Sequence, residues 1–215
     1  MAKVGFMGRL TASAMHEIQN VLAGVKESAG LMDDLLAMTK EKDCPNRDKF
    51  RKVLSSIQEL VERGVRLSSE VNRLGHASQS EIVPVDLAEV ARRTIFLAYR
   101  ITQTRRMNFV LIPGGQIQAG LTVLEAMRSL FLVMEQLTEL LPQCSIVNVR
   151  VDSFKGRPAL RLSCDQAANS DLAPVPDLVL ARQLPAGVDC LVADMELILT
   201  FPAHDPGLGG QGQGA

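Results

Sequence analysis

Residues 14–36, AMHEIQNVLAGVKESAGLMDDLL, carry the repeat that decides how the first part of this chain folds. Apolar residues recur there in alternating steps of three and four, which is the spacing of one apolar face on a helix in a bundle. This seam consists of Ala14, Ile18, Leu22, Val25, Ala29, Met32 and Leu36. The periodicity predicts a long helix over residues 6–39.

A second helix with the same repeat is predicted over residues 48–75. Its stripe consists of Phe50, Leu54, Ile57, Val61, Gly64, Ser68, Val71 and Leu74. The segment 40–47, which contains Cys44-Pro45-Asn46, is predicted to be a turn. Two helices joined by a short turn form an antiparallel hairpin, which cannot enclose its own apolar stripe. A second copy of the hairpin would complete a four-helix bundle, so we expect a homodimer.

We expect residues 1–79 to form this hairpin domain and residues 80–203 to form a second domain. Helices are predicted at 85–104, with a cap at Asp86, at 120–141 and at 176–184. Strands are predicted at 107–113, 146–154, 159–164, 190–193 and 196–201. This order predicts an α+β domain, with helices on one face of a mixed sheet. The glycine-rich residues 204–215 are predicted to be a disordered tail.

One imidazole, that of His16, is predicted to lie on the exposed side of the first helix. At about 100° per residue, His16 is roughly 160° away from Ile18 and therefore off the apolar seam. A zinc-binding His-Glu-x-x-His helix would need a second histidine where this chain has Asn20. Asn20 follows His16 by one helical turn, and Glu17 flanks the same surface. A solvated surface histidine and a phosphoryl-accepting imidazole both fit this arrangement.

Composition excludes several classes of function. The formal net charge is −1, so we expect neither a nucleic-acid partner nor a membrane surface. The four cysteines contain no CxxC pair, which favours small core residues in a reducing cytosol over disulfides or a metal site. No apolar run has the length of a signal peptide or a membrane span. We therefore expect a soluble cytoplasmic protein with no metal of its own.

Residues 6–75 resemble the dimerisation and phosphoacceptor hairpin of bacterial sensor histidine kinases. The first helix of that family carries a His-Glu-hydrophobic-polar-Thr/Asn box, which is matched by His16-Glu17-Ile18-Gln19-Asn20. Residues 85–202 are similar in element order and length to the ATP-binding α/β sandwich of these kinases. The resemblance implies that His16 accepts the phosphoryl group and that Glu17 could bind the other ring nitrogen. Asn20 matches the position that orients a hydrolytic water.

The second domain departs from the kinase pattern in the residues that would hold nucleotide. Gln136 stands where the family has its magnesium-binding Asn. The family motif Asp-x-Gly-x-Gly is represented by Asp165-Gln166-Ala167-Ala168-Asn169, which keeps the Asp and lacks both glycines. The segment between Asp165 and the next predicted helix is also too short for a nucleotide lid. The resemblance therefore implies a degenerate ATP-binding domain that binds neither ATP nor Mg²⁺.

A chain that keeps the acceptor and lacks the ATP machinery resembles the dimeric histidine phosphotransferases of multi-step phosphorelays. This resemblance implies that His16 takes a phosphoryl group from one response-regulator receiver domain and passes it to another, with Mg²⁺ supplied by the receiver. A hybrid sensor kinase is a further candidate partner. Two alternatives stay open: a non-catalytic pseudokinase that regulates a sensor kinase or receiver by binding it, and a divergent ATP-dependent histidine kinase.

Overall fold

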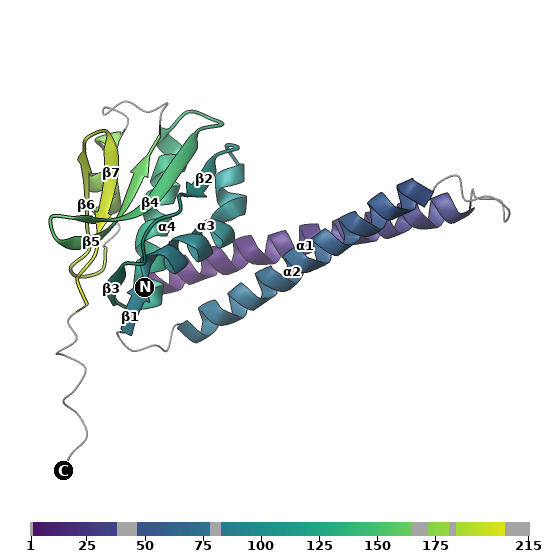
Figure 1. Ribbon diagram of the computed structural model, residues 1–215, viewed down its shortest axis with the longest axis horizontal. Helices are drawn as coiled ribbons and strands as arrows, with labels where there is room; N and C mark the ends of the chain where they lie inside the picture. Colours follow the sequence, from purple (N-terminus) through teal and green to yellow (C-terminus); the bar gives the residue numbers. More distant parts are fainter. Residues whose placement is uncertain (1, 38–46, 78–82, 165–171, 181–183, 205–215) are drawn as a thin grey trace, which may run out of the picture. The chain divides into compact units, whose positions relative to one another are not determined.

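The computed structural model describes residues 2–37, 47–77, 83–164, 172–180 and 184–204. The chain divides into two compact units. The hairpin unit is Gly8–Arg73, and the α+β unit is Met1–Met7 together with Leu74–Ala215. Figure 1 shows the two long helices of the first unit and the sheet of the second.

Helices α1 (Ala2–Ala37) and α2 (Arg47–Ala77) confirm the two predicted helices. Within the hairpin unit they approach closely at two glycines. A Cβ built on Gly24 would lie 3.1 Å from Cδ1 of Leu60, and one on Gly64 would lie 3.1 Å from Cγ1 of Val21. The predicted turn falls largely in residues 38–46, outside the part of the chain that is described.

Part of the predicted seam is not covered within one chain. Leu22 is 61% exposed and Val61 is 47% exposed, although both belong to the predicted stripes. The neighbouring Val21 is buried at 4% exposure, because the contact between the two helices uses a face of α1 next to the predicted one. The hairpin therefore has two apolar faces, of which the other helix covers one.

The α+β unit contains three helices and two sheets within the described residues. The helices are α3 (Leu87–Gln103), α4 (Val123–Leu140) and α6 (Val175–Leu180). The strands are β1 (Val83–Asp86), β2 (Asn108–Leu111), β3 (Gln118–Leu121), β4 (Ile146–Phe154), β5 (Arg157–Ser163), β6 (Asp189–Ala193) and β7 (Glu196–Thr200). The main sheet has the order β2-β4-β5-β7-β6, in which β2 runs parallel to β4 and the other pairs are antiparallel. The predicted mixed sheet is thus confirmed.

The helices cover one face of the main sheet (Figure 1). Val147, Val149 and Val151 of β4 are buried, whereas Arg150 between them is exposed, as the alternating sequence predicted. The first turn of α1 also contributes to the core of this unit. The rings of Phe6 and Phe131 meet edge-on, with their centroids 5.2 Å apart.

The start of α4 corrects the helix predicted over 120–141. Residues Gln118–Leu121 form β3, which pairs antiparallel with β1 in a separate two-stranded sheet. The helix begins only after Thr122, whose hydroxyl accepts a hydrogen bond from the backbone N–H of Glu125 at 3.3 Å in a capping box. The capping residue Thr122, and not the apolar sequence before it, therefore sets the start of the helix. Strands β1 and β3 were both missed by the sequence prediction.

Gly120 lies against the backbone near the end of the described chain. Its N–H donates to the carbonyl of Pro202 at 2.9 Å, and Ala119 forms a β-bridge with Ala203. A Cβ on Gly120 would lie 2.6 Å from the carbonyl oxygen of Ala203, so only glycine fits without a shift of backbone. This contact explains why a glycine stands in β3.

Other boundaries differ by a few residues. The predicted cap at Asp86 is confirmed, since its Oδ1 accepts from the N–H of Ala88 at 2.8 Å. The β4–β5 turn is shorter than predicted, because Lys155 and Gly156 both have positive φ and close a two-residue hairpin. Apart from His204, the predicted tail lies outside the described residues. No helix in the described ranges is both long enough and apolar enough to cross a membrane.

Candidate functional site

His16 lies on α1 with its side chain exposed to solvent. Among the described residues, none forms a hydrogen bond or an ion pair with its imidazole. Asn20 is also exposed and follows by one helical turn, so the two side chains share one face of the helix. Both ring nitrogens of His16 are therefore open to a molecule that approaches from outside.

Glu17 is held by the second helix. Its Oε1 lies 2.6 Å from Nη2 of Arg63 on α2, and its side chain is only 14% exposed. Glu17 shares a helix face with Val21 and Gly24, the residues that contact α2. The carboxylate therefore points into the contact between the helices, where it forms an ion pair with Arg63 and does not bind the ring of His16. Sequence reasoning did not identify Arg63.

The small or apolar residues near His16 are predicted from the sequence to suit the docking of a receiver domain; they are Leu10, Ala12, Met15, Ala23 and Gly24. The structure divides them into two groups. Met15 is 46% exposed, and Ala12 and Ala23 are exposed as well. Leu10 is fully buried and Gly24 faces Leu60, so the expectation that these two residues form part of the docking surface was wrong. The apolar surface next to His16 is consequently smaller than the sequence suggested.

The exposed face of α1 offers the imidazole of His16 and the amide of Asn20. No described group of three or more His, Cys, Asp or Glu residues is arranged to hold a metal ion. Phosphoryl transfer depends mainly on in-line positioning and on neutralising the charge of the phosphoryl oxygens. A partner that brings its own cation and its own phosphoryl group would need only an accessible imidazole here.

Gln136 of α4 is buried, with 2% of its surface exposed. Its amide nitrogen has no hydrogen-bond partner among the described residues. This buried amide occupies the position at which the sequence analysis placed the magnesium-binding Asn of the kinases. The degenerate motif at residues 165–169 lies outside the described part of the chain.

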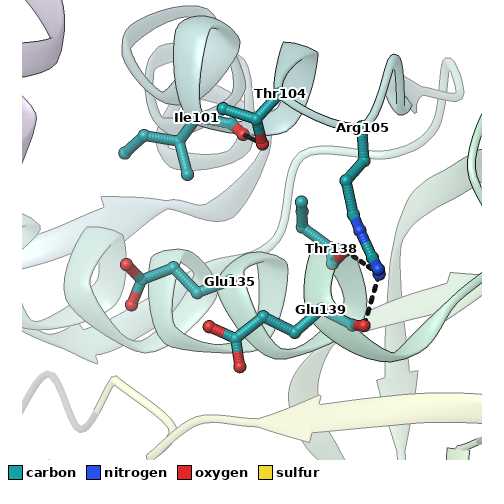
Figure 2. A pocket seen from close by; sticks show the side chains of 6 residues that line it. All are labelled: Ile101, Thr104, Arg105, Glu135, Thr138 and Glu139. Carbon is teal, nitrogen blue, oxygen red and sulfur yellow. Dashed lines mark hydrogen bonds between the residues drawn. The ribbon is translucent and has the colours of Figure 1, made fainter.

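A pocket of about 400 Å³ lies between α3 and α4 and contains none of the predicted site residues (Figure 2). Its walls are formed by Ile101, Thr104, Arg105, Glu135, Thr138 and Glu139. Nη1 of Arg105 donates to the carbonyl of Thr138 at 3.1 Å and also to that of Glu139 (Figure 2). These carbonyls belong to the last turn of α4, so Arg105 caps the C-terminus of this helix. The positive charge of Arg105 is favourable there, at the negative end of the helix dipole.

The described cysteines differ in accessibility. Cys164 and Cys190 are buried, which confirms the predicted core placement, and burial raises the pKa of the Cys190 thiol to about 12. Cys144 is exposed, so the prediction was wrong for this residue. Cys144 has a positive φ of 64° just before β4, and this places it in a surface turn. None of these thiols lies in the hairpin unit with His16.

Comparisons with known proteins give structural likenesses only. No family model matches this chain. No curated protein matches it either. The cytoplasmic segment of the histidine kinase QseC is similar at 14% identity over 67% of this chain and 95% of that chain, with a TM-score of 0.42.

Two further solved structures cover more of the chain. The Acinetobacter baumannii histidine kinase AdeS is similar at 9% identity over 88% of this chain and 98% of that chain, with a TM-score of 0.44. A bacterial phosphotransferase is similar at 12% identity over 90% of this chain and 94% of that chain, with a TM-score of 0.43. TM-scores below 0.5 and identities below 25% assign neither a family nor an activity, so the function rests on the residues themselves.

Proposed function

We propose that this chain is a cytoplasmic histidine phosphotransferase of a bacterial two-component phosphorelay. In this proposal His16 carries a phosphoryl group between the aspartates of two response-regulator receiver domains. The observation that carries it is the exposed imidazole of His16, which has no partner among the described residues and lies one turn from the exposed amide of Asn20. The His-Glu-x-x-Asn sequence around it supports the same function.

The proposed step balances without a further reactant. An unprotonated ring nitrogen of His16 attacks the phosphorus of an aspartyl phosphate on the receiver. An N–P bond forms while the P–O bond to the aspartyl group breaks, and the carboxylate leaves with the electron pair. The second ring nitrogen keeps its proton throughout. Transfer to a second receiver reverses these changes.

The hairpin has little to add beyond the nucleophile. A large fraction of imidazole is unprotonated near neutral pH, so histidine can attack there without a strong base. The Mg²⁺ and the lysine of the receiver neutralise the phosphoryl charge in this scheme. Asn20 is available to bind a phosphoryl oxygen or a water molecule beside it. Glu17, bound to Arg63, acts through the helix contact and not as a base.

We further propose that two copies of the hairpin form a four-helix bundle. The support is the set of large apolar side chains of the predicted stripes and their neighbours that one hairpin leaves exposed, since exposed apolar surface of this kind marks an interface. These residues are Leu22, Leu54, Val61 and Val65. A second copy would cover the same stripes on both helices, and each dimer would then carry two copies of His16.

ATP has no part in the proposed reaction. The buried Gln136 and the missing glycines at 165–169 support a domain that no longer serves nucleotide chemistry. Incubation with radiolabelled ATP alone separates this proposal from a divergent histidine kinase. Label on His16 under these conditions would support the kinase and contradict the relay.

The central experiment is transfer from a receiver domain that has been phosphorylated with a radiolabelled donor. We expect label to move to the wild-type chain, and from it to a second, unlabelled receiver. His16→Ala should take up no label, whereas His76→Ala and His204→Ala, which remove the other two histidines, should behave as wild type. Failure of the wild type to take up label from any receiver, with stable binding to one of them, would favour the non-catalytic regulator.

A further inference from the structure

The ion pair between Glu17 and Arg63 joins the two helices directly beside the proposed acceptor. Arg63 is partly exposed at 36%, and Glu17 is the more enclosed partner at 14%. The close approaches of Val21 to Gly64 and of Gly24 to Leu60 follow within two turns of α1. The ion pair is therefore part of a tightly packed contact, in which its geometry is held by the neighbouring residues.

The charge on Glu17 matters because a phosphoryl group carries about 1.5 to 2 negative charges near neutral pH. Glu17 is the residue next to His16, so its carboxylate is the negative group of α1 that is nearest in sequence to the arriving phosphoryl group. An unpaired carboxylate there would repel both the phosphorylated receiver and the phosphohistidine product. A guanidinium at 2.6 Å cancels most of this repulsion.

We propose that Arg63 is a positioning residue for phosphoryl transfer at His16, an inference that rests on the proposed function. Arg63 binds the Glu17 carboxylate, neutralises it, and holds it in the helix contact and away from the surface on which the receiver docks. Arg63 thus acts from α2 on the reaction at α1, without touching the reacting atoms. In this way a residue of the second helix raises the rate of phosphoryl transfer at His16, in addition to the part that this helix plays in the fold.

The test is the initial rate of label transfer from a phosphorylated receiver to His16. Arg63→Gln should lower this rate about three- to tenfold, the size expected for one unpaired charge near a dianion at a solvated surface. Arg63→Lys, which keeps the charge, should restore most of the rate. The double variant Glu17→Gln with Arg63→Gln should also recover, because no carboxylate is left unpaired. Arg66→Gln removes an exposed arginine from the same helix and is the matched control, with an unchanged rate.

These variants separate charge compensation from a purely structural ion pair. A structural role would lower the melting temperature of Arg63→Gln and of the double variant alike, and the double variant would not regain its rate. Full transfer by Arg63→Gln, or no recovery in the double variant, overturns the inference while His16 remains the acceptor. Absence of label on the wild type overturns the proposed function and the inference with it.

Discussion

Gly64 of α2 faces Val21 of α1 so closely that a Cβ on residue 64 would lie 3.1 Å from Cγ1 of Val21. Contacts this short are tighter than those of ordinary side-chain packing, so the absence of a side chain at residue 64 sets how near the two helices come. Gly24 plays the same part opposite Leu60. The distance between the helices in turn sets whether Arg63 can reach Glu17.

The first prediction concerns these helix contacts. Gly64→Leu should destabilise the hairpin by about 1 to 3 kcal/mol, because the larger side chain forces the helices apart. Gly30→Ala is the matched control, since nothing lies within 4 Å of a Cβ there and alanine is the better helix former by about 1 kcal/mol. Urea denaturation followed by circular dichroism should therefore show opposite shifts. Equal stabilisation by both substitutions would contradict the packing at Gly64.

A second prediction addresses the homodimer. Leu22→Asp or Val61→Asp should convert a dimer into a monomer, because each puts a charge on an apolar side chain that is exposed in the single chain. Ser55→Asp, at an exposed position of α2 about 100° around the helix from Leu54, is the control and should leave the dimer intact. Sedimentation equilibrium or light scattering measures the mass directly. A wild-type protein that is monomeric at micromolar concentration would contradict the proposed four-helix bundle.

A third prediction concerns the small sheet. Gly120→Ala should destabilise the α+β unit by about 1 to 3 kcal/mol, since the new methyl group meets the backbone carbonyl of Ala203 and cannot be relieved by a rotamer change. Gly115→Ala, with nothing within 4 Å of its Cβ, should cost far less. Thermal unfolding of both variants provides the comparison. Equal melting temperatures would show that residues 202–204 do not lie on β3 in solution.

A fourth prediction follows from the thiols. In the native protein at pH 8, Cys144 should react with a thiol reagent quickly, while Cys164 and Cys190 should react only after unfolding. The pKa of Cys190 is raised from 9.0 to about 12 by burial, so above pH 9 the unfolded chain loses a proton that the folded chain keeps. Stability should therefore fall with rising pH between about 9 and 12, and Cys190→Val should flatten this dependence.

The hairpin illustrates what periodicity can and cannot predict. The three- and four-residue steps located both helices, because a helix is specified by local spacing. The face of α1 that meets α2 was misplaced by one position, and Arg63 was missed entirely. The length and conformation of the turn between two antiparallel helices determine which of their residues meet. The sequence of either helix alone does not contain this information.

The missed strands have a different cause. Strands β1 and β3 are four residues long and are separated in sequence by an entire helix and strand β2. Neither shows the alternation that marked β4, and Gly120 and Leu121 of β3 run into the apolar sequence of α4. Pairing between short, distant strands is a tertiary effect, so only the capping residue Thr122 indicated the true boundary.

The placement of the last strands has a consequence for synthesis of the protein. Strand β7 lies between β5 and β6 in the main sheet, and Pro202 and Ala203 complete the free edge of β3. Contacts between residues this far apart in sequence form late and slowly. On the ribosome, helices α1 and α2 can form as soon as they emerge. Strand β5 remains unpaired on one side until Thr200 has emerged, and the edge of β3 remains open until Ala203 has emerged.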